Sequence, residues 1–194
     1  MGRALELFME RVSVEEEVRK TLREVLNRPI KEILSYVIMS EKDATSMYNY
    51  LYQKIPMDYA KETFKKFVEM EASHDRKVMS IFNSLFPGEE PPKVPFKSWT
   101  EIFAEKDFRL NTVKDYLDIL KIAMDSEILA EKVYQFLEER LEDPAHKRIM
   151  LELAQDEREH YEFIKKEYEL CSKIEAEMSL KELVKELMRD KKSQ

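Results

Sequence analysis

Two copies of the pattern Glu-x-x-His stand out in this sequence, at Glu71/His74 and at Glu157/His160. Residues three apart on a helix share a face, so each copy presents a carboxylate oxygen and an imidazole nitrogen to the same point. A glutamate or histidine alone is weak evidence in so acidic a chain. Two copies on two helices predict a pair of facing ligand sets.

Another glutamate lies 30 residues before each copy, at Glu41 and Glu127. Together these residues supply the four carboxylates and two imidazoles of a carboxylate-bridged two-metal site in a helix bundle. Oxygen and nitrogen ligands without thiolate suit iron or manganese, with zinc as a possible substitute. We therefore expect two iron ions per chain, held by Glu41, Glu71, His74, Glu127, Glu157 and His160.

The position of these acids on their helices favours a buried site. Glu41 has Leu34, Val37, Ile38 and Ala44 around it at helical spacings, and the other three glutamates sit in similar apolar stripes. A buried unpaired carboxylate costs several kcal/mol, and divalent cations remove that penalty. The alternative is that all six residues lie on the surface of a glutamate-rich helical protein.

Four more candidates have simpler explanations. Tyr48 and Tyr134 each follow a glutamate by seven residues, and either pack in the core or hydrogen-bond to a ligand carboxylate. His146 also has an acid three positions before it, but it falls outside the repeated pattern and is expected on the surface. Cys171 is the only cysteine, which excludes a disulfide framework and a four-cysteine metal site.

Composition limits the remaining possibilities. The chain has 194 residues, 43% of them hydrophobic and 38% charged, and only two glycines, which favours an all-α protein. A net charge of −7 argues against a nucleic-acid partner. No apolar run is long enough to span a membrane, and the start lacks the apolar segment of a signal peptide, so we expect a cytoplasmic protein. The many Glu and Lys residues are typical of proteins from thermophiles.

Helical periodicity, interrupted by a few breakers, defines the expected elements. Asp58, Asn111 and Asp143 are the predicted N-caps of the last three long helices. Pro87, Pro91, Pro92 and Pro95 exclude a continuous helix between residues 86 and 110, although a short one fits near Thr100–Lys106. The predicted helices are an N-terminal arm at Ala4–Leu26, either as one helix or as two divided at the capping box Ser13-x-x-Glu16, then Pro29–Gln53, Asp58–Leu85, Thr112–Leu141, Pro144–Glu177, and a short C-terminal helix that begins at the capping box Ser179-x-x-Glu182.

Four long helices in two pairs, joined by one long crossover, predict a ferritin-like four-helix bundle. We expect the arm at residues 1–28, the bundle at 29–177, and a short helix and tail at 178–194. A shift of 86 residues superimposes one helix pair on the other, because Ile33, Leu34, Ser40, Glu41, Tyr48, Leu51, Glu71 and His74 fall on Ile119, Leu120, Ser126, Glu127, Tyr134, Leu137, Glu157 and His160.

With these motifs in place, the sequence resembles the rubrerythrin branch of the ferritin-like superfamily over roughly residues 29–170. The resemblance implies a non-haem diiron centre that reacts with hydrogen peroxide or dioxygen, as in defence against oxidative stress, and a homodimer. It also implies that Glu71 and Glu157 bridge the two metal ions.

Two departures from the rubrerythrin pattern matter. Rubrerythrins typically carry a four-cysteine iron domain, which a single cysteine excludes here, so a separate electron-donor protein is expected. A further glutamate usually follows the ligand of the third helix by three residues, and here that position is Ala130. Two other functions stay open: oxidation of ferrous iron for storage or detoxification, and a non-catalytic helical interaction protein that metal only stabilises.

Overall fold

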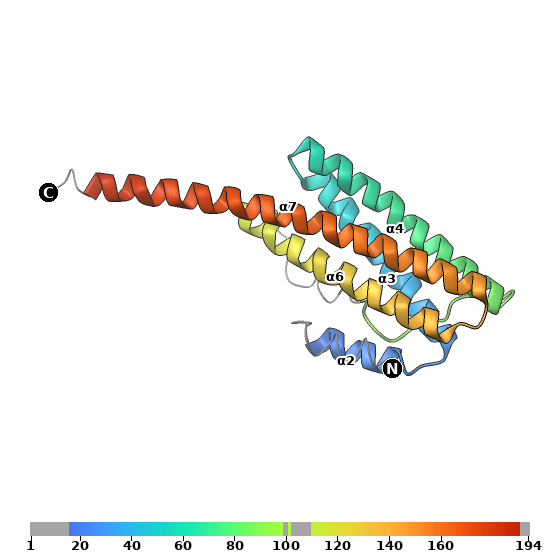
Figure 1. Ribbon diagram of the computed structural model, residues 1–194. Coiled ribbons are helices and arrows are strands. Elements are labelled where there is room, and N and C mark those ends of the chain that lie inside the picture. Colours follow the sequence, from blue (N-terminus) through green and yellow to red (C-terminus); the bar gives the residue numbers. More distant parts are fainter. Residues whose placement is uncertain (1–15, 99–100, 102–109, 191–194) are drawn as a thin grey trace.

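Five helices make up most of the chain that the computed structural model describes, which comprises residues 16–98, 101 and 110–190 (Figure 1). They are α2 (Glu16–Val25), α3 (Ile30–Lys54), α4 (Asp58–Leu85), α6 (Val113–Arg140) and α7 (Pro144–Asp190). None of these helices combines the length and apolar character needed to cross a lipid bilayer. The predicted all-α class is confirmed.

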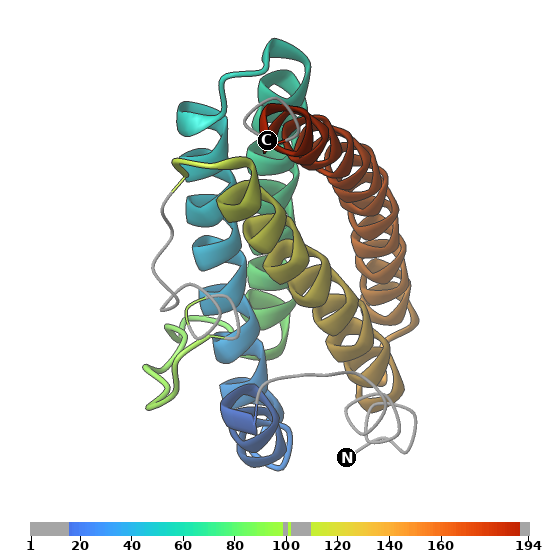
Figure 2. The ribbon, with the colours of Figure 1, turned by 90° about the vertical axis from the view of Figure 1, so that its left-hand side faces the viewer.

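The long helices pack as two hairpins, α3 with α4 and α6 with α7. Turns of three residues join the helices of each hairpin, which makes them antiparallel. Figure 2 shows that α4 ends at one end of the bundle and α6 begins at the other, so the segment between them runs the length of the bundle. This single long crossover is the predicted ferritin-like topology.

Two of the predicted N-caps are wrong. At α4, Asp58 is the first helical residue, and the cap position belongs to Met57, whose side chain makes no capping hydrogen bond. At α6, the cap is Thr112, one residue after Asn111. Thr112 Oγ1 accepts from the Asp115 N–H at 3.1 Å, while Asp115 Oδ2 accepts from the Thr112 N–H at 2.9 Å. This reciprocal capping box satisfies two donors of the first turn, which explains why the helix begins at Val113.

The start of α7 agrees with prediction, since the Asp143 carboxylate accepts from the Ala145 N–H at 2.7 Å. Its end does not. We expected a break near Glu177 and a separate short helix from Ser179, but α7 continues unbroken to Asp190. Neither glycine nor proline occurs between residues 145 and 190, so the capping box at Ser179 has no chain break to stabilise.

The core consists of two apolar clusters along the bundle axis. One combines α2 with the first half of α3 and the second half of α6, and includes Leu22, Ile33 and Leu137. The other joins the second half of α3 to the first halves of α4 and α6, and includes Leu51 and Phe64. The four acidic positions predicted as ligands fall between the two clusters.

The N-terminal arm packs on the bundle in its described part, because Val18, Leu22, Val25 and Leu26 of α2 and its C-terminal end are buried in the first cluster. Residues 4–15 of the predicted arm lie outside the described residues. So do the crossover aromatics Trp99, Phe103 and Phe108, and all but Glu101 of the short helix predicted there.

Candidate metal centre

The six predicted ligands meet in the middle of the bundle, one or two from each long helix. Each of the six is at most 2% exposed. Helix α3 supplies Glu41, α4 Glu71 and His74, α6 Glu127, and α7 Glu157 and His160. The spacing of three residues in each Glu-x-x-His places carboxylate and imidazole on the inward face of α4 and of α7.

Each imidazole points its Nδ1 atom into the carboxylates. His74 Nδ1 lies 3.0 Å from Glu157 Oε1, 3.5 Å from Glu71 Oε2 and 3.6 Å from Glu41 Oε2. His160 Nδ1 lies 3.0 Å from Glu71 Oε1, 3.1 Å from Glu127 Oε2 and 3.3 Å from Glu157 Oε2. The two rings stack with their centroids 5.6 Å apart. Both histidines therefore face the same two glutamates, Glu71 and Glu157.

These contacts define two overlapping groups of possible ligands. Each group brings four ligand atoms within 4.8 Å of one another, and both contain Glu71 and Glu157. The groups are Glu41, Glu71, His74 and Glu157, and Glu71, Glu127, Glu157 and His160. Glu71 and Glu157 are thus shared by both groups, with one additional glutamate and one histidine on either side.

The donor set fits metal ions better than it fits an apolar core. Glu41 Oε2, Glu71 Oε1, His74 Nδ1 and both carboxylate oxygens of Glu157 are buried with no hydrogen bond of good geometry within the described chain, and their near neighbours include other ionisable groups of the site. Buried polar atoms are nearly always hydrogen-bonded, and each one left unpaired is costly. Two divalent cations would satisfy all of these atoms at once.

Without metal, the two outer carboxylates, Glu41 and Glu127, which each belong to one ligand group only, favour their protonated forms. Burial raises the pKa of Glu41 to about 8, against the lowering effect of its hydrogen bond to His74. Burial and the charge of Glu157 likewise raise the pKa of Glu127 well above its usual value.

The two shared carboxylates behave in the opposite way. Burial acts to raise the pKa of Glu71, but its hydrogen bonds to His160 and His74 outweigh that effect and lower it. Burial also opposes ionisation of Glu157, yet the charge of His74 and hydrogen bonds from its neighbours lower its pKa far below the usual value. The two shared carboxylates, Glu71 and Glu157, are therefore the natural anions of the site.

Both imidazoles favour the protonated form when no metal is bound. Burial acts to lower the pKa of His74, but the charge of Glu157 and a hydrogen bond to Asp156 raise it far above its usual value. The pKa of His160 is raised in the same way, by hydrogen bonds to Glu127, Glu157 and Glu71 against the effect of burial. Protons thus take the place of metal charge, and metal binding must displace them.

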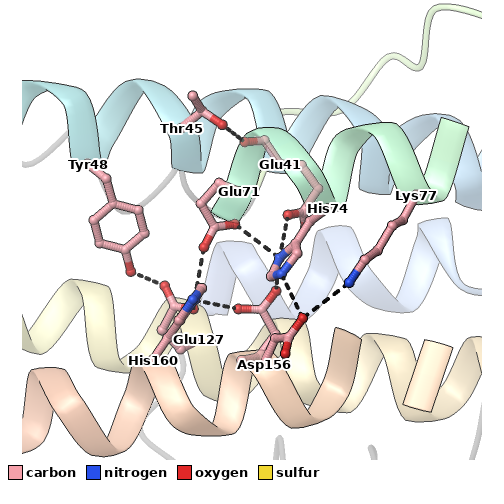
Figure 3. Close-up of polar contacts among 10 residues, drawn as sticks. Glu41, Thr45, Tyr48, Glu71, His74, Lys77, Glu127, Asp156 and His160 are labelled. Atoms are coloured by element: carbon pink, nitrogen blue, oxygen red, sulfur yellow. Dashed lines mark hydrogen bonds and ion pairs between the residues drawn. The ribbon is translucent and has the colours of Figure 1, made fainter. Parts of the chain in front are cut away.

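The two tyrosines extend the site across the helix pairs. The Tyr48 hydroxyl on α3 donates to Glu127 Oε1 on α6 (Figure 3). A hydrogen bond to a candidate ligand carboxylate was one of the two predicted roles of this tyrosine. Tyr134 on α6 is fully buried, and burial together with the nearby charge of Glu41 on α3 raises its pKa well above the usual value. Each tyrosine therefore lies near the outer glutamate of the opposite helix pair.

One further carboxylate contacts the site, and no sequence pattern indicated it. Asp156 lies immediately before Glu157, and its Oδ2 atom is 3.3 Å from His74 Nε2 and 3.3 Å from Lys77 Nζ (Figure 3). The hydrogen bond from His74 lowers the pKa of Asp156, so this carboxylate stays charged. A carboxylate that accepts from the ring nitrogen pointing away from the metal, here the outer nitrogen Nε2, fixes the tautomer and orientation of a ligand histidine. Sequence spacing gave no signal for this contact, because it joins α7 to α4.

The other histidine has no equivalent support. His160 Nε2 is buried without a hydrogen bond, and its ring lies 4.4 Å from that of Phe67, centroid to centroid. The repeat of 86 residues puts Met70 where Asp156 stands in the second copy. A methionine side chain is a weak acceptor at best. The two halves of the centre are therefore chemically different.

The position of the missing glutamate is filled by a small apolar side chain. Ala130 is buried, and so is Ala44, its counterpart on α3. Glu131 is buried as well, but its carboxylate turns away to Lys132, Gln135 and Arg158. It belongs to neither group of possible ligands.

The prediction for His146 is wrong, since its side chain is only 8% exposed. The ends of α4 and α6 surround the first turn of α7, and His146 lines a cavity there with Leu85, Arg140 and Asp143. Helical pattern alone gave no sign that these ends converge. His146 nevertheless stays outside both ligand groups. Cys171 is a buried thiol.

The chain matches a known protein family and is similar to a solved structure. A family model described as rubrerythrin matches residues 32–189 of the chain. A hypothetical protein from Pyrococcus furiosus has a similar structure, with a TM-score of 0.69 and 29% sequence identity over 78% of this chain and 96% of the other. No curated protein matches the sequence. Because the family model covers most of the chain, including all six candidate ligands, this protein belongs to the rubrerythrin family.

Proposed function

We propose that this member of the rubrerythrin family is a non-haem diiron oxidoreductase that reduces hydrogen peroxide, with electrons from a separate donor protein. The observation that carries the proposal is the pair of overlapping ligand groups, which share Glu71 and Glu157 in the middle of the bundle. Four carboxylates and two imidazoles suit iron, and suit manganese or zinc less specifically.

In this proposal the chain positions two metal ions and keeps water away from them. Glu71 and Glu157 would bridge the ions, Glu41 and His74 would complete one side, and Glu127 and His160 the other. When bound, two adjacent ferrous ions supply both electrons needed to cleave an O–O bond. The Tyr48 hydroxyl holds the Glu127 carboxylate in place, and Asp156 holds the His74 ring.

Two further features support the choice of reaction. The site is enclosed by apolar residues, which suits a small, uncharged substrate such as peroxide. The single cysteine of the chain excludes a four-cysteine iron domain within it, which supports an external electron donor. Ala130 favours the second candidate, ferrous iron oxidation, because one carboxylate fewer is present to rearrange as the charge on iron rises.

The first test is the metal content of protein stripped with a chelator and reloaded anaerobically with Fe(II). We expect about two ions per chain, and at most about one ion, weakly held, in Glu157→Ala. Glu159→Ala is the matched control, because Glu159 lies on the same helix with its side chain exposed and should bind like the unmodified chain. Saturation of the unmodified chain below one ion would refute the metal centre.

The second test separates the two reactions. Stopped-flow oxidation of the reduced diiron protein should be faster with hydrogen peroxide than with dioxygen, and repeated reduction should restore the same rate. A preference for dioxygen, with oxidised iron accumulating well beyond two ions per chain, would instead identify a ferroxidase.

A further inference from the structure

The C-terminal part of α7 leaves the bundle without a partner helix. Figure 1 shows this part of α7 projecting alone beyond the ends of its neighbours. Among the side chains of α7 that the structure describes, Cys171 is the last buried one, and the large apolar side chains described beyond it are largely exposed. We call residues 170–190 the C-terminal arm. Its exposed apolar residues are Leu170, Ile174, Met178, Leu180, Leu183, Val184 and Met188, each between 44% and 64% exposed.

Six of these seven residues are arranged symmetrically about Ser179. Leu170 and Met188 lie nine residues on either side of it, Ile174 and Val184 five, and Met178 and Leu180 one. The charged residues two positions away, Glu177 and Lys181, have opposite signs. A two-fold antiparallel helix pair requires this kind of pattern, because residue i of one chain meets residue j of the other, and j meets i.

The symmetric residues also share one side of the helix. With 3.6 residues per turn, four of the symmetric apolar residues and the charged pair Glu177 and Lys181 lie within about 40° of a single line along the arm. Met178 and Leu180 flank that line at about 80° on either side, and Ser179 lies opposite. The six residues near the line are Leu170, Ile174, Glu177, Lys181, Val184 and Met188.

We propose that the C-terminal arm binds the same arm of a second copy of this chain, antiparallel and centred on Ser179. In this register Leu170 meets the partner's Met188, and Ile174 meets the partner's Val184, along about 27 Å of helix. The interface is isologous and closes on itself as a dimer.

Charge selects the antiparallel direction. Two equivalent pairs form at the centre of the antiparallel contact, each between Glu177 of one arm and Lys181 of the other. A parallel pair would instead oppose Glu177 to the partner's Glu177 and Lys181 to the partner's Lys181, and like charges in contact repel. The arm as a whole is also nearly neutral, with four basic and five acidic residues between 170 and 190, in a chain whose net charge is −7.

An apolar cavity at the base of the arm continues the same surface. It has a volume of about 290 Å³ and is lined by Ile55, Met57, Val113, Cys171 and Ile174, among others. The proposed register brings the end of the partner's arm, at the partner's Met188, to this end of the bundle. Contact there would add the rim of the bundle to the helix–helix interface.

The native mass of the full chain, measured by light scattering after size-exclusion chromatography, tests the proposal. The chain mass is 23.3 kDa, so we expect at least twice that value. Ile174→Glu and Val184→Glu should each halve the native mass, or raise the dissociation constant of the assembly at least tenfold. Leu151→Glu is the matched control, because Leu151 is a similarly exposed apolar residue of α7 that lies beside the bundle. This substitution should leave the native mass unchanged.

Charge exchange tests the direction and the register. Glu177→Lys and Lys181→Glu should each weaken the assembly, since each variant creates two pairs of like charges. The double variant Glu177→Lys/Lys181→Glu restores opposite charges and should recover the native mass. Circular dichroism and Fe(II) content should stay the same in all of these variants, which separates this test from that of the metal centre.

Other outcomes would overturn the proposal. A monomeric native chain up to about 100 µM, or arm variants with an unchanged native mass, would remove the arm as an interface. Failure of the double variant to recover the mass, while both single variants dissociate, would exclude the antiparallel register.

Discussion

At the scale of single residues, the two histidines of the candidate centre have different surroundings. The outer nitrogen of His74 contacts Asp156, whereas that of His160 lies in an apolar environment beside Phe67. A carboxylate partner increases the basicity of a ligand imidazole and fixes its orientation. We therefore expect the metal position next to His74 to bind more tightly than the one next to His160.

Asp156→Asn should weaken one of the two metal positions. Loss of such a carboxylate typically costs 10–100-fold in metal affinity, and we expect an effect in that range. Competition with a coloured chelator under anaerobic conditions would measure it. Asp118→Asn, a change at an exposed aspartate of α6, should bind like the unmodified chain, and equal affinities for the two variants would contradict the assigned role of Asp156.

Metal binding should release protons at neutral pH. The raised pKa of Glu41, about 8, and the raised pKa values of Glu127, His74 and His160 keep these groups protonated in the metal-free protein. Because metal ions bind the deprotonated forms, the apparent affinity should rise between pH 6 and pH 8. Calorimetry in two buffers with different ionisation enthalpies counts the protons. A binding enthalpy independent of the buffer would contradict the prediction.

At the scale of single elements, helix termini decide where the ligands lie along the bundle. The capping box of α6 sets its first turn, and Glu127 follows four turns later on the same helix. A helix that began one residue earlier, as Asn111 had suggested, would gain no such reciprocal pair of hydrogen bonds.

Thr112→Ala should therefore destabilise the protein, whereas Asn111→Ala should not. Loss of a threonine cap costs about 0.5–2 kcal/mol of unfolding free energy, and a surface substitution outside the cap usually changes it by less than about 0.5 kcal/mol. Urea unfolding of the two variants, followed by circular dichroism, measures the difference. Equal stabilities would show that the side chain of Thr112 contributes no cap.

At the scale of the whole molecule, a polar layer separates two apolar clusters. Four carboxylates and two imidazoles occupy the centre of the bundle, where apolar packing would otherwise be continuous. Such a layer is unfavourable for folding on its own, because buried ionisable groups lose their hydration. Metal ions that bind only the folded state reverse that effect by mass action.

Removal of metal should accordingly lower the melting temperature. At a free metal concentration one hundred times the dissociation constant, a bound ion stabilises the folded state by about 2.7 kcal/mol. For a chain of this size that corresponds to about 5–10 °C. Differential scanning calorimetry before and after chelation measures the shift. Glu71→Ala should melt at the same temperature with and without metal, and an unchanged melting temperature of the unmodified chain, with metal removal verified, would contradict the prediction.

The sequence by itself determined the ligand set and the order of the helices. Glu-x-x-His repeats and glutamates at equal spacing are local patterns, and a helix converts such spacing directly into a shared face. Long apolar periodicity and a proline-rich interruption likewise defined two hairpins and one crossover, because both signals lie within single segments.

Only the tertiary structure decided the features that depend on contacts between segments. Asp156 contacts a histidine on another helix, His146 is buried by the converging ends of α4 and α6, and no local pattern encodes either neighbour. The end of α7 was also beyond local reasoning, because a capping box starts a new helix only where the chain leaves the helical path before it. The sequence contained the symmetric apolar residues of the C-terminal arm throughout, but their exposure became apparent only when the bundle left that part of α7 uncovered.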